Sequence, residues 1–286
     1  MNVSKDEIKK VVREGYAQIA KQNNSCCAPA NSCCGGADLA QNMSKKIGYT
    51  EGELQAVPEG ANLGLGCGNP VALASLREGE TVLDLGSGAG LDCFLAANKV
   101  GKNGKVIGVD MTQEMIEKAK ENARKGRYAN VEFKLGEIEN LPVASNSVDA
   151  IISNCVINLS TDKKSVFREA FRVLKPGGRL MISDLVLLKA LPDFIKNSIE
   201  AYVGCISGAI MKDEYVKAIK AAGFRKVKMV DETSFPIEGI VSSQTAKAII
   251  ENLRIPSEKL KELKDIANSV VSIKVHGIKP NKALPD

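Results

Sequence analysis

A glycine-rich run directly after a short apolar segment constrains the fold of this chain more than any other feature. The run Asp84-Leu85-Gly86-Ser87-Gly88-Ala89-Gly90 closes the β-rich segment 81–85 and leads into a helical pattern that begins at Leu91. Glycines at a strand-to-helix turn let a nucleotide approach the backbone closely. A dinucleotide fingerprint needs G-x-G-x-x-G, but Leu91 stands where its third glycine would be. The run therefore favours a smaller adenine-bearing cofactor over NAD.

Short β-rich runs alternate with helical periodicity from about residue 70 to 190. Such alternation is typical of an α/β fold in which helices cover both faces of a mostly parallel sheet. The segment Lys175-Pro176-Gly177-Gly178 is expected to reverse the chain before the last of these strands. The expected strands are 81–85, 105–109, 131–135, 148–153 and 179–187, and the expected helices are 91–97, 113–125 and 163–174.

The ends of the chain differ from this core in pattern. Residues 1 to about 25 have the spacing of an amphipathic helix, which a mobile cysteine-rich loop at 25–40 interrupts. We expect a division into an N-terminal part (1–60), a cofactor-binding sheet domain (61–190) and a C-terminal part that completes the sheet (191–286). Beyond residue 190 the pattern predicts helices at 193–204, 213–222, 243–253 and 257–267, a strand at 225–230 and a final apolar segment at 270–275.

Charge and cysteine content narrow the function classes. The 39 Lys and Arg residues are interspersed with 34 Asp and Glu, for a net charge of +5, so a nucleic-acid partner has little support. The N-terminus is charged, and no run approaches the roughly 18 apolar residues of a membrane span. We therefore expect a cytoplasmic protein without a membrane partner. In that compartment eight cysteines indicate ligation, catalysis or redox exchange rather than disulfide staples.

Acidic residues stand at the ends of successive expected strands. Asp84 precedes the glycine run, where a negative charge suits an ammonium or sulfonium better than a phosphate. Asp110, 24 residues after Gly86, can accept hydrogen bonds from both ribose hydroxyls, and Met111 can pack on an adenine. Glu137 follows the third strand. Together these acids favour S-adenosylmethionine as the cofactor.

At these residues the sequence resembles a known family. The segments Val82–Gly90 and Gly108–Thr112 look like class I S-adenosylmethionine methyltransferases, and Ser153–Leu159 with Gly66-Cys67-Gly68 looks like the arsenite methyltransferases among them. The resemblance covers about residues 60 to 235 and implies a seven-stranded Rossmann-like sheet with a small C-terminal α+β extension. The expected cofactor-binding residues are Asp84, Gly86, Ser87, Gly88, Gly90, Asp110, Met111, Glu137, Ile138 and Asn154.

In that family three separated cysteines do the arsenic chemistry, and the matching positions are Cys67, Cys155 and Cys205. Trivalent arsenic is soft and prefers a pyramid of three sulfurs, which leaves its lone pair free to attack a sulfonium methyl group without a general base. A protein thiol pair can then reduce the oxidised arsenic by forming a disulfide. The resemblance implies thioredoxin or glutathione-type thiols as the external reductant and an enzyme that detoxifies arsenite and methylated arsenicals.

Two other functions stay open at this point: a class I enzyme that methylates carbon, oxygen or nitrogen of a small metabolite, and a non-catalytic metalloid-binding protein. We expect Cys93 to be a buried packing residue and His276 to have no catalytic role. The pairs Cys26-Cys27 and Cys33-Cys34 can form a mobile thiol arm, an incidental tail or, less favoured, a zinc site. A monomer is favoured, while the number of methyl groups added and the selectivity against antimony or selenium stay open.

Overall fold

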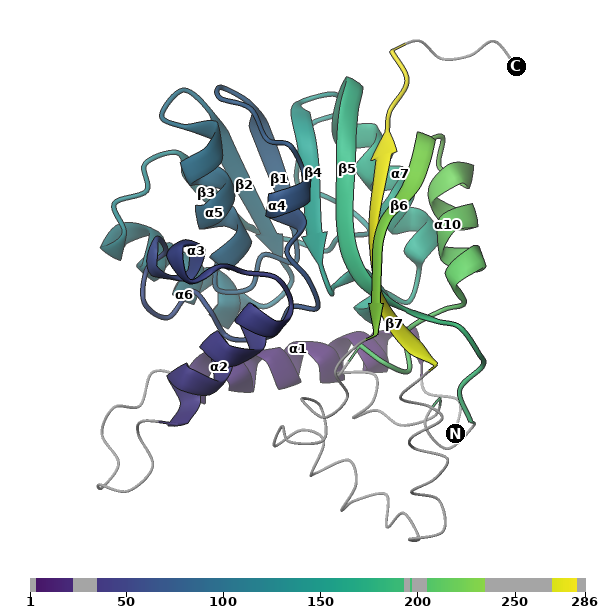
Figure 1. Ribbon diagram of the computed structural model, residues 1–286, viewed down its shortest axis with the longest axis horizontal. Helices are drawn as coiled ribbons and strands as arrows, with labels where there is room; N and C mark the ends of the chain where they lie inside the picture. Colours follow the sequence, from purple (N-terminus) through teal and green to yellow (C-terminus); the bar gives the residue numbers. More distant parts are fainter. Residues whose placement is uncertain (1–3, 23–34, 193–195, 197–204, 235–268, 282–286) are drawn as a thin grey trace, which may run out of the picture.

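A computed structural model describes residues 4–22, 35–192, 196, 205–234 and 269–281 of the chain. Seven strands form one sheet in the order β3-β2-β1-β4-β5-β7-β6 (Figure 1). Strands β1 to β5 pair in parallel, whereas β7 runs antiparallel to both of its neighbours. The expected Rossmann-like α/β fold is thus confirmed. The strands are β1 (Thr81–Leu85), β2 (Lys105–Asp110), β3 (Val131–Leu135), β4 (Val148–Asn154), β5 (Leu174–Leu187), β6 (Arg225–Ser234) and β7 (Val270–Ile278).

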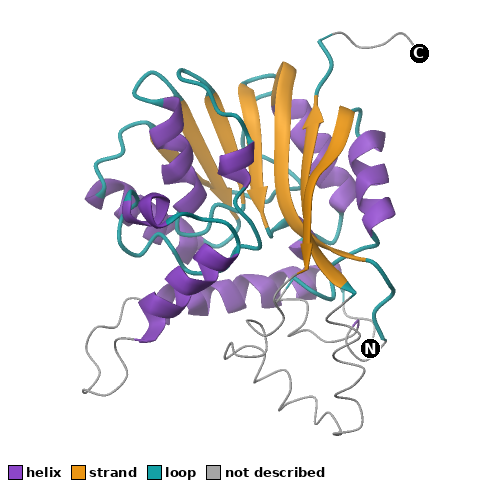
Figure 2. Ribbon diagram, viewed as in Figure 1, coloured by secondary structure: helices purple, strands orange, loops and turns teal. Residues whose placement is uncertain are grey.

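Helices cover both faces of the sheet (Figure 2). Because side chains alternate along a strand, Val82 packs in one cluster with Phe94 of α5, whereas Leu83 packs in the opposite cluster with Phe167 of α7. Burying both faces explains why the parallel strands are nearly continuous runs of branched apolar residues. The helical segments are α1 (Lys5–Gln22), α2 (Gly35–Lys46), α3 (Glu51–Gln55), α4 (Pro70–Leu73), α5 (Leu91–Val100), α6 (Gln113–Lys125), η1 (Ile157–Leu159), α7 (Lys163–Val173) and α10 (Lys212–Ala221).

The strand order reverses between β1 and β4. The chain builds β1, β2 and β3 outward in one direction and then returns to place β4 on the other side of β1. In open α/β sheets the crevice at the carboxyl end of the strands at this switch point is where ligands bind. Helix α1 lies across that end of the sheet (Figure 1). It is fixed there by a Lys21–Glu114 ion pair of 2.9 Å to α6 and by the burial of Val12.

Most of the expected elements are confirmed, several with identical bounds, and the differences have local causes. Residues Lys175 to Gly178 do not separate α7 from a strand but form an irregular part of β5, where the register shifts between Val148 and Ala150 of β4. Helix α2 begins at Gly35, inside the segment expected to be a loop as far as residue 40. The expected helices 193–204, 243–253 and 257–267 and the cysteines 26, 27, 33 and 34 lie essentially outside the described residues.

Among the helices of the described residues, none has the combination of length and apolar composition that crossing a bilayer requires. The proposed division of the chain at residues 60 and 190 stays a prediction.

Candidate active site

A pocket opens at the switch point of the sheet, between α1 and the carboxyl ends of β1, β2 and β4. Nine of the residues expected from the sequence line it: Asp84, Gly86, Ser87, Gly88, Asp110, Met111, Ile138, Asn154 and Cys155. Lys9 and Tyr16 of α1 line it as well, so the N-terminal helix forms one wall. Among the expected residues, Gly90, Glu137, Cys67 and Cys205 do not contribute to this lining.

The glycine run positions Asp110. The backbone N–H of Gly88 donates to Asp110 Oδ2 at 2.9 Å, and that of Thr112 donates to Oδ1 at 2.9 Å. Gly86 and Gly88 reach this geometry with φ of 70° and 51°, a region that favours glycine. Burial raises the pKa of the Asp110 carboxyl, an effect that the two backbone hydrogen bonds oppose. The carboxylate is thereby held in one orientation at the pocket wall.

Gly90 and Glu137 have other partners than the pocket. A Cβ at Gly90 would lie 2.7 Å from the ring of Phe94, so this glycine allows close packing of the helix that follows. The Glu137 carboxylate pairs with Lys9 at 2.6 Å and with Arg13 at 3.5 Å, both on α1. Its neighbour Glu139 lines the pocket instead and lies 3.3 Å from Lys9. These acids therefore attach the N-terminal helix to the pocket rim.

A second buried carboxylate, Asp92, stands beside Asp84 in the pocket wall. The Tyr49 hydroxyl donates to Asp92 Oδ1 at 2.7 Å, and the Cys93 thiol donates to Asp84 Oδ2 at 3.2 Å. Burial raises the pKa of Asp84 well above its usual range and that of Asp92 to about 6. Asp92 is not among the residues expected from the sequence, although an acid in the first turn of the helix after the glycine run was a usable signal. Cys93, expected only to pack, also contacts a pocket acid.

The Asn154 amide joins this acidic wall to the segment that carries Cys67. Its Nδ2 donates to the Tyr49 hydroxyl at 2.8 Å, to the Gly68 carbonyl at 2.8 Å and to Asp92 Oδ2 at 3.0 Å. Its Oδ1 accepts from the Cys67 backbone N–H at 3.0 Å. The amide is therefore saturated by contacts with protein groups.

The glycines on both sides of Cys67 are required by close packing. A Cβ at Gly66 would lie 2.6 Å from Asn154 Nδ2, and a Cβ at Gly68 would collide with Ser183 Oγ of β5. Any larger residue would move the segment away from the sheet. The Gly-Cys-Gly pattern thus places the Cys67 thiol against the carboxyl ends of β4 and β5.

All three expected cysteines are buried and share one apolar cluster with Val12 of α1 and Leu185 of β5. They are free thiols with 3%, 8% and 4% exposure at Cys67, Cys155 and Cys205, so water is nearly excluded from them. Cys155 and Cys205 adopt φ of 56° and 62°, a strained backbone for a non-glycine residue. Such strain persists only where the surrounding structure enforces it.

The thiols differ in their contacts. Hydrogen bonds with Cys205 and Cys67, followed by burial, raise the pKa of the Cys155 thiol well above its usual range, while burial raises that of Cys67. The Cys205 thiol donates to the Cys155 carbonyl at 3.1 Å and lies 4.0 Å from the Tyr16 hydroxyl of α1. The Cys67 and Cys155 sulfurs lie within 4.8 Å of each other, and the Cys205 sulfur is not part of that group. At least one of the three side chains must therefore move to bring all three sulfurs onto one atom.

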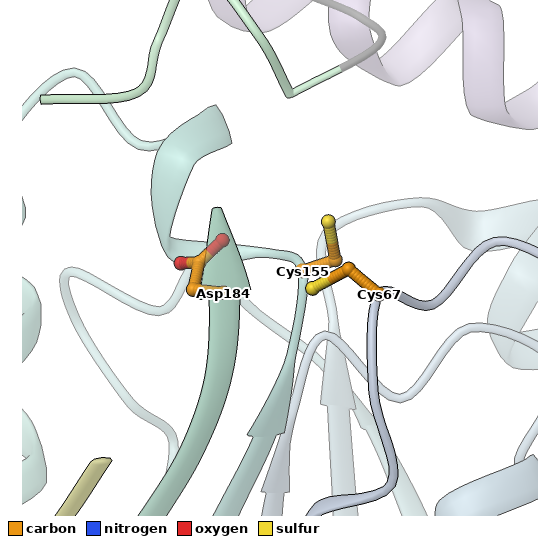
Figure 3. A group of neighbouring side chains, drawn as sticks. All are labelled: Cys67, Cys155 and Asp184. Carbon is orange, nitrogen blue, oxygen red and sulfur yellow. The ribbon is translucent and has the colours of Figure 1, made fainter. Parts of the chain in front are cut away.

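Besides Asp84 and Asp92, a third buried acid, Asp184 of β5, lies beside the Cys67 and Cys155 thiols. One of its carboxylate oxygens lies within 4.8 Å of both the Cys67 and the Cys155 sulfur (Figure 3). Burial raises its pKa to about 6. Asp184 is not among the residues expected from the sequence, although an aspartate inside the apolar run Met181–Leu187 was an available signal. His276 lies on β7, away from the pocket lining.

Comparison with known proteins shows the family of the chain. A family model described as a methyltransferase domain matches residues 76–223. The chain belongs to the methyltransferase domain family. A Halobacterium salinarum protein named arsenite methyltransferase is 48% identical over 231 residues, which are 78% of this methyltransferase chain and 59% of that protein. A human protein of the same name is 35% identical over 242 residues, 81% of this chain and 62% of its own length.

One solved structure has the same fold and a related sequence. CrArsM, an arsenic(III) S-adenosylmethionine methyltransferase from Chlamydomonas reinhardtii, is 28% identical with a TM-score of 0.60, covering 88% of this methyltransferase chain and 74% of that one. The chain spans about three fifths of the length of the two curated relatives given above.

Proposed function

We propose that this methyltransferase transfers methyl groups from S-adenosylmethionine to trivalent arsenic, either arsenite or methylarsenite. One observation carries the proposal: three buried free thiols share a cluster that touches the cofactor pocket through Cys155. A methyltransferase that acts on carbon, oxygen or nitrogen has no need of three thiols there. A protein that only sequesters metalloids has no need of the pocket acids.

The pocket residues fit S-adenosylmethionine, which supplies a methyl group activated on a sulfonium. The Asp110 carboxylate, held by two backbone N–H groups, can accept hydrogen bonds from a ribose. The Ser87 hydroxyl is buried without a hydrogen-bond partner in the described part of the chain, and a ligand can satisfy it. Asp84 and Asp92 offer two buried negative charges to an ammonium and a sulfonium, so a cation in the pocket favours their ionised forms.

The thiol cluster fits a soft trivalent metalloid. In each exchange a cysteine S–H replaces an arsenic-bound hydroxyl, which leaves as water, so loading of arsenite onto three thiols needs no net proton acceptor. The lone pair of the resulting trithiolate arsenic is the nucleophile, and no general base has to ionise it. The apolar residues around the thiols exclude water from this centre.

Methyl transfer oxidises the arsenic centre, and two of the three thiols can return two electrons to it by forming a disulfide. An external thiol of the thioredoxin or glutathione type then reduces that disulfide by exchange. We take Cys155 and Cys205 as that pair, because the Cys205 thiol donates to the backbone carbonyl of Cys155 at 3.1 Å and the two residues are therefore in contact.

The test is to incubate the full chain with arsenite, S-adenosylmethionine and a thiol, and to resolve methylated arsenicals by chromatography coupled to mass detection. We expect methylated products from the native chain and none from Cys155→Ser or Cys205→Ser. Calorimetric titration with S-adenosylmethionine should give the same dissociation constant for these variants as for the native chain, which shows that their pocket is folded. Native product formation by either variant would refute the proposal, and absence of cofactor binding would indicate a metalloid-binding protein.

A further inference from the structure

Asp184 and Cys205 offer different third ligands to the same two thiols. A carboxylate oxygen of Asp184 and the sulfurs of Cys67 and Cys155 lie within 4.8 Å of one another, and Figure 3 shows the Cys67 sulfur facing the acid. The Cys205 sulfur is instead directed to the Cys155 carbonyl, 3.1 Å away. The cluster thus holds one ligand set of two sulfurs and an oxygen, while an overlapping set of three sulfurs forms only after a side chain moves.

The two ligand sets suit different elements. A carboxylate oxygen is a hard ligand, which arsenic(III) does not prefer, whereas zinc and cadmium bind thiolates and carboxylates together. Two thiolates and one carboxylate also leave a tetrahedral ion with one open position. Asp184 therefore gives the set of two sulfurs and one oxygen a preference for zinc or cadmium over arsenic(III) that the set of three sulfurs does not have.

Hydrogen-bond donors fix the Asp184 carboxylate in one orientation, as they commonly do for a carboxylate that binds a metal. Its carboxylate accepts hydrogen bonds from Asn158 Nδ2, the Leu185 backbone N–H and the Tyr215 hydroxyl, each at 2.9 Å. Such partners fix the orientation of a ligating carboxylate.

We propose that Cys67, Cys155 and Asp184 form a site for a thiophilic divalent cation, zinc or cadmium, which competes with arsenic(III) for two of its thiols. Binding replaces the two S–H protons, which go to solvent, and forms two metal–sulfur bonds and one metal–oxygen bond. The cation site stands on the geometry alone, whereas its competition with arsenic rests on the proposed function. A cell rich in zinc or cadmium would then methylate arsenic more slowly.

The experiment compares Cd²⁺ and arsenite binding by calorimetry in the full chain, with a phosphine reductant. Every protein carries serine at positions 26, 27, 33 and 34, so that only the buried thiols are measured. Asp184→Asn should raise the Cd²⁺ dissociation constant by about tenfold or more, while Cys205→Ser changes it by less than about threefold. For arsenite the expectation is reversed: Cys205→Ser should raise the dissociation constant by about tenfold or more, and Asp184→Asn should change it by less than about threefold. The matched control is Asp149→Asn, which removes an acid that is paired with Lys175 at 2.9 Å outside the cluster.

A measurement on the unsubstituted buried site keeps the test valid if Asp184→Asn does not fold. The ¹¹³Cd nuclear magnetic resonance shift depends on the number of thiolate ligands, and we expect the value for two thiolates. A three-thiolate shift, or loss of Cd²⁺ binding in Cys205→Ser but not in Asp184→Asn, would overturn the proposed cation site. Arsenite binding without Cd²⁺ binding would also overturn it and leave the proposed function intact. Cd²⁺ binding without arsenite binding would refute the proposed function alone.

Discussion

The Asn154 amide connects the cofactor pocket to the thiol cluster, so its removal tests the structure of both. Asn154→Ala deletes the acceptor of the Cys67 N–H and the donor to Gly68, Tyr49 and Asp92. Two amide hydrogens serve those three acceptors, so the loss equals about three full hydrogen bonds, one of them to a carboxylate. At about 1 kcal/mol for each of the two neutral bonds and about 2 kcal/mol for the charged one, we expect the free energy of unfolding to fall by about 4 kcal/mol.

The same substitution should loosen the segment that holds Cys67. Urea denaturation under reducing conditions measures the free energy of unfolding, and calorimetry measures the dissociation constants for arsenite and S-adenosylmethionine. We expect the arsenite dissociation constant to rise by about tenfold or more, because the position of the Cys67 thiol is no longer fixed. The control is Asn98→Ala, whose exposed amide donates to the Ala56 carbonyl at 3.4 Å and which should change the free energy of unfolding by less than about 0.5 kcal/mol.

The expectation would be refuted if Asn154→Ala lowered the free energy of unfolding by less than about 1 kcal/mol and left the dissociation constants for arsenite and S-adenosylmethionine unchanged. Asn154 would then be an incidental polar contact, and the Gly-Cys-Gly segment would be held by the sheet alone.

Three further predictions address charge and packing. Asp92 has a pKa of about 6 in the folded protein against an ordinary value of 3.8, so the native state keeps a proton that the unfolded state loses, and the free energy of unfolding falls as the pH rises from about 4 to 6. Asp92 should contribute about 2 kcal/mol to this loss, beside the contributions of Asp84 and Asp184, whose pKa values burial also raises. Urea denaturation at several pH values should therefore show a loss that Asp92→Asn reduces by about that amount, and an unchanged pH slope in the variant contradicts the assignment. Asp110→Ala should raise the S-adenosylmethionine dissociation constant by about tenfold to a hundredfold in calorimetry, with arsenite binding nearly intact, and equal loss of both would mean that the two sites are not separable. Gly68→Ala should lower the arsenite affinity because its Cβ collides with Ser183 Oγ, and Ser183→Gly in the same chain should restore the affinity if that collision is the cause.

The elements of the sheet domain could be predicted because their signals are local. Strands β1 and β3 and helix α6 have the bounds that the apolar pattern predicts, since periodicity within a few residues distinguishes strand from helix. The start of helix α2 could not be predicted because it lies in a segment rich in Gly, Ser and Cys, where no apolar periodicity is visible. The irregular start of β5 could not be predicted either. Pro176 and Gly177 are typical turn residues, and the local sequence does not show that they lie within a strand here.

The sequence by itself determined the fold class, the glycine run with Asp84 and Asp110, and the three cysteines that match the family. Only the tertiary structure decided that Tyr16 of α1 contacts Cys205, 189 positions away, and that Tyr49 and Asn154, 105 positions apart, meet at Asp92. It likewise placed Asp184 beside Cys67 and Cys155. The physical reason is one of range: backbone preferences and side-chain periodicity act over one or two turns or a few strand residues, whereas these contacts depend on strand order, register and helix packing across the whole sheet.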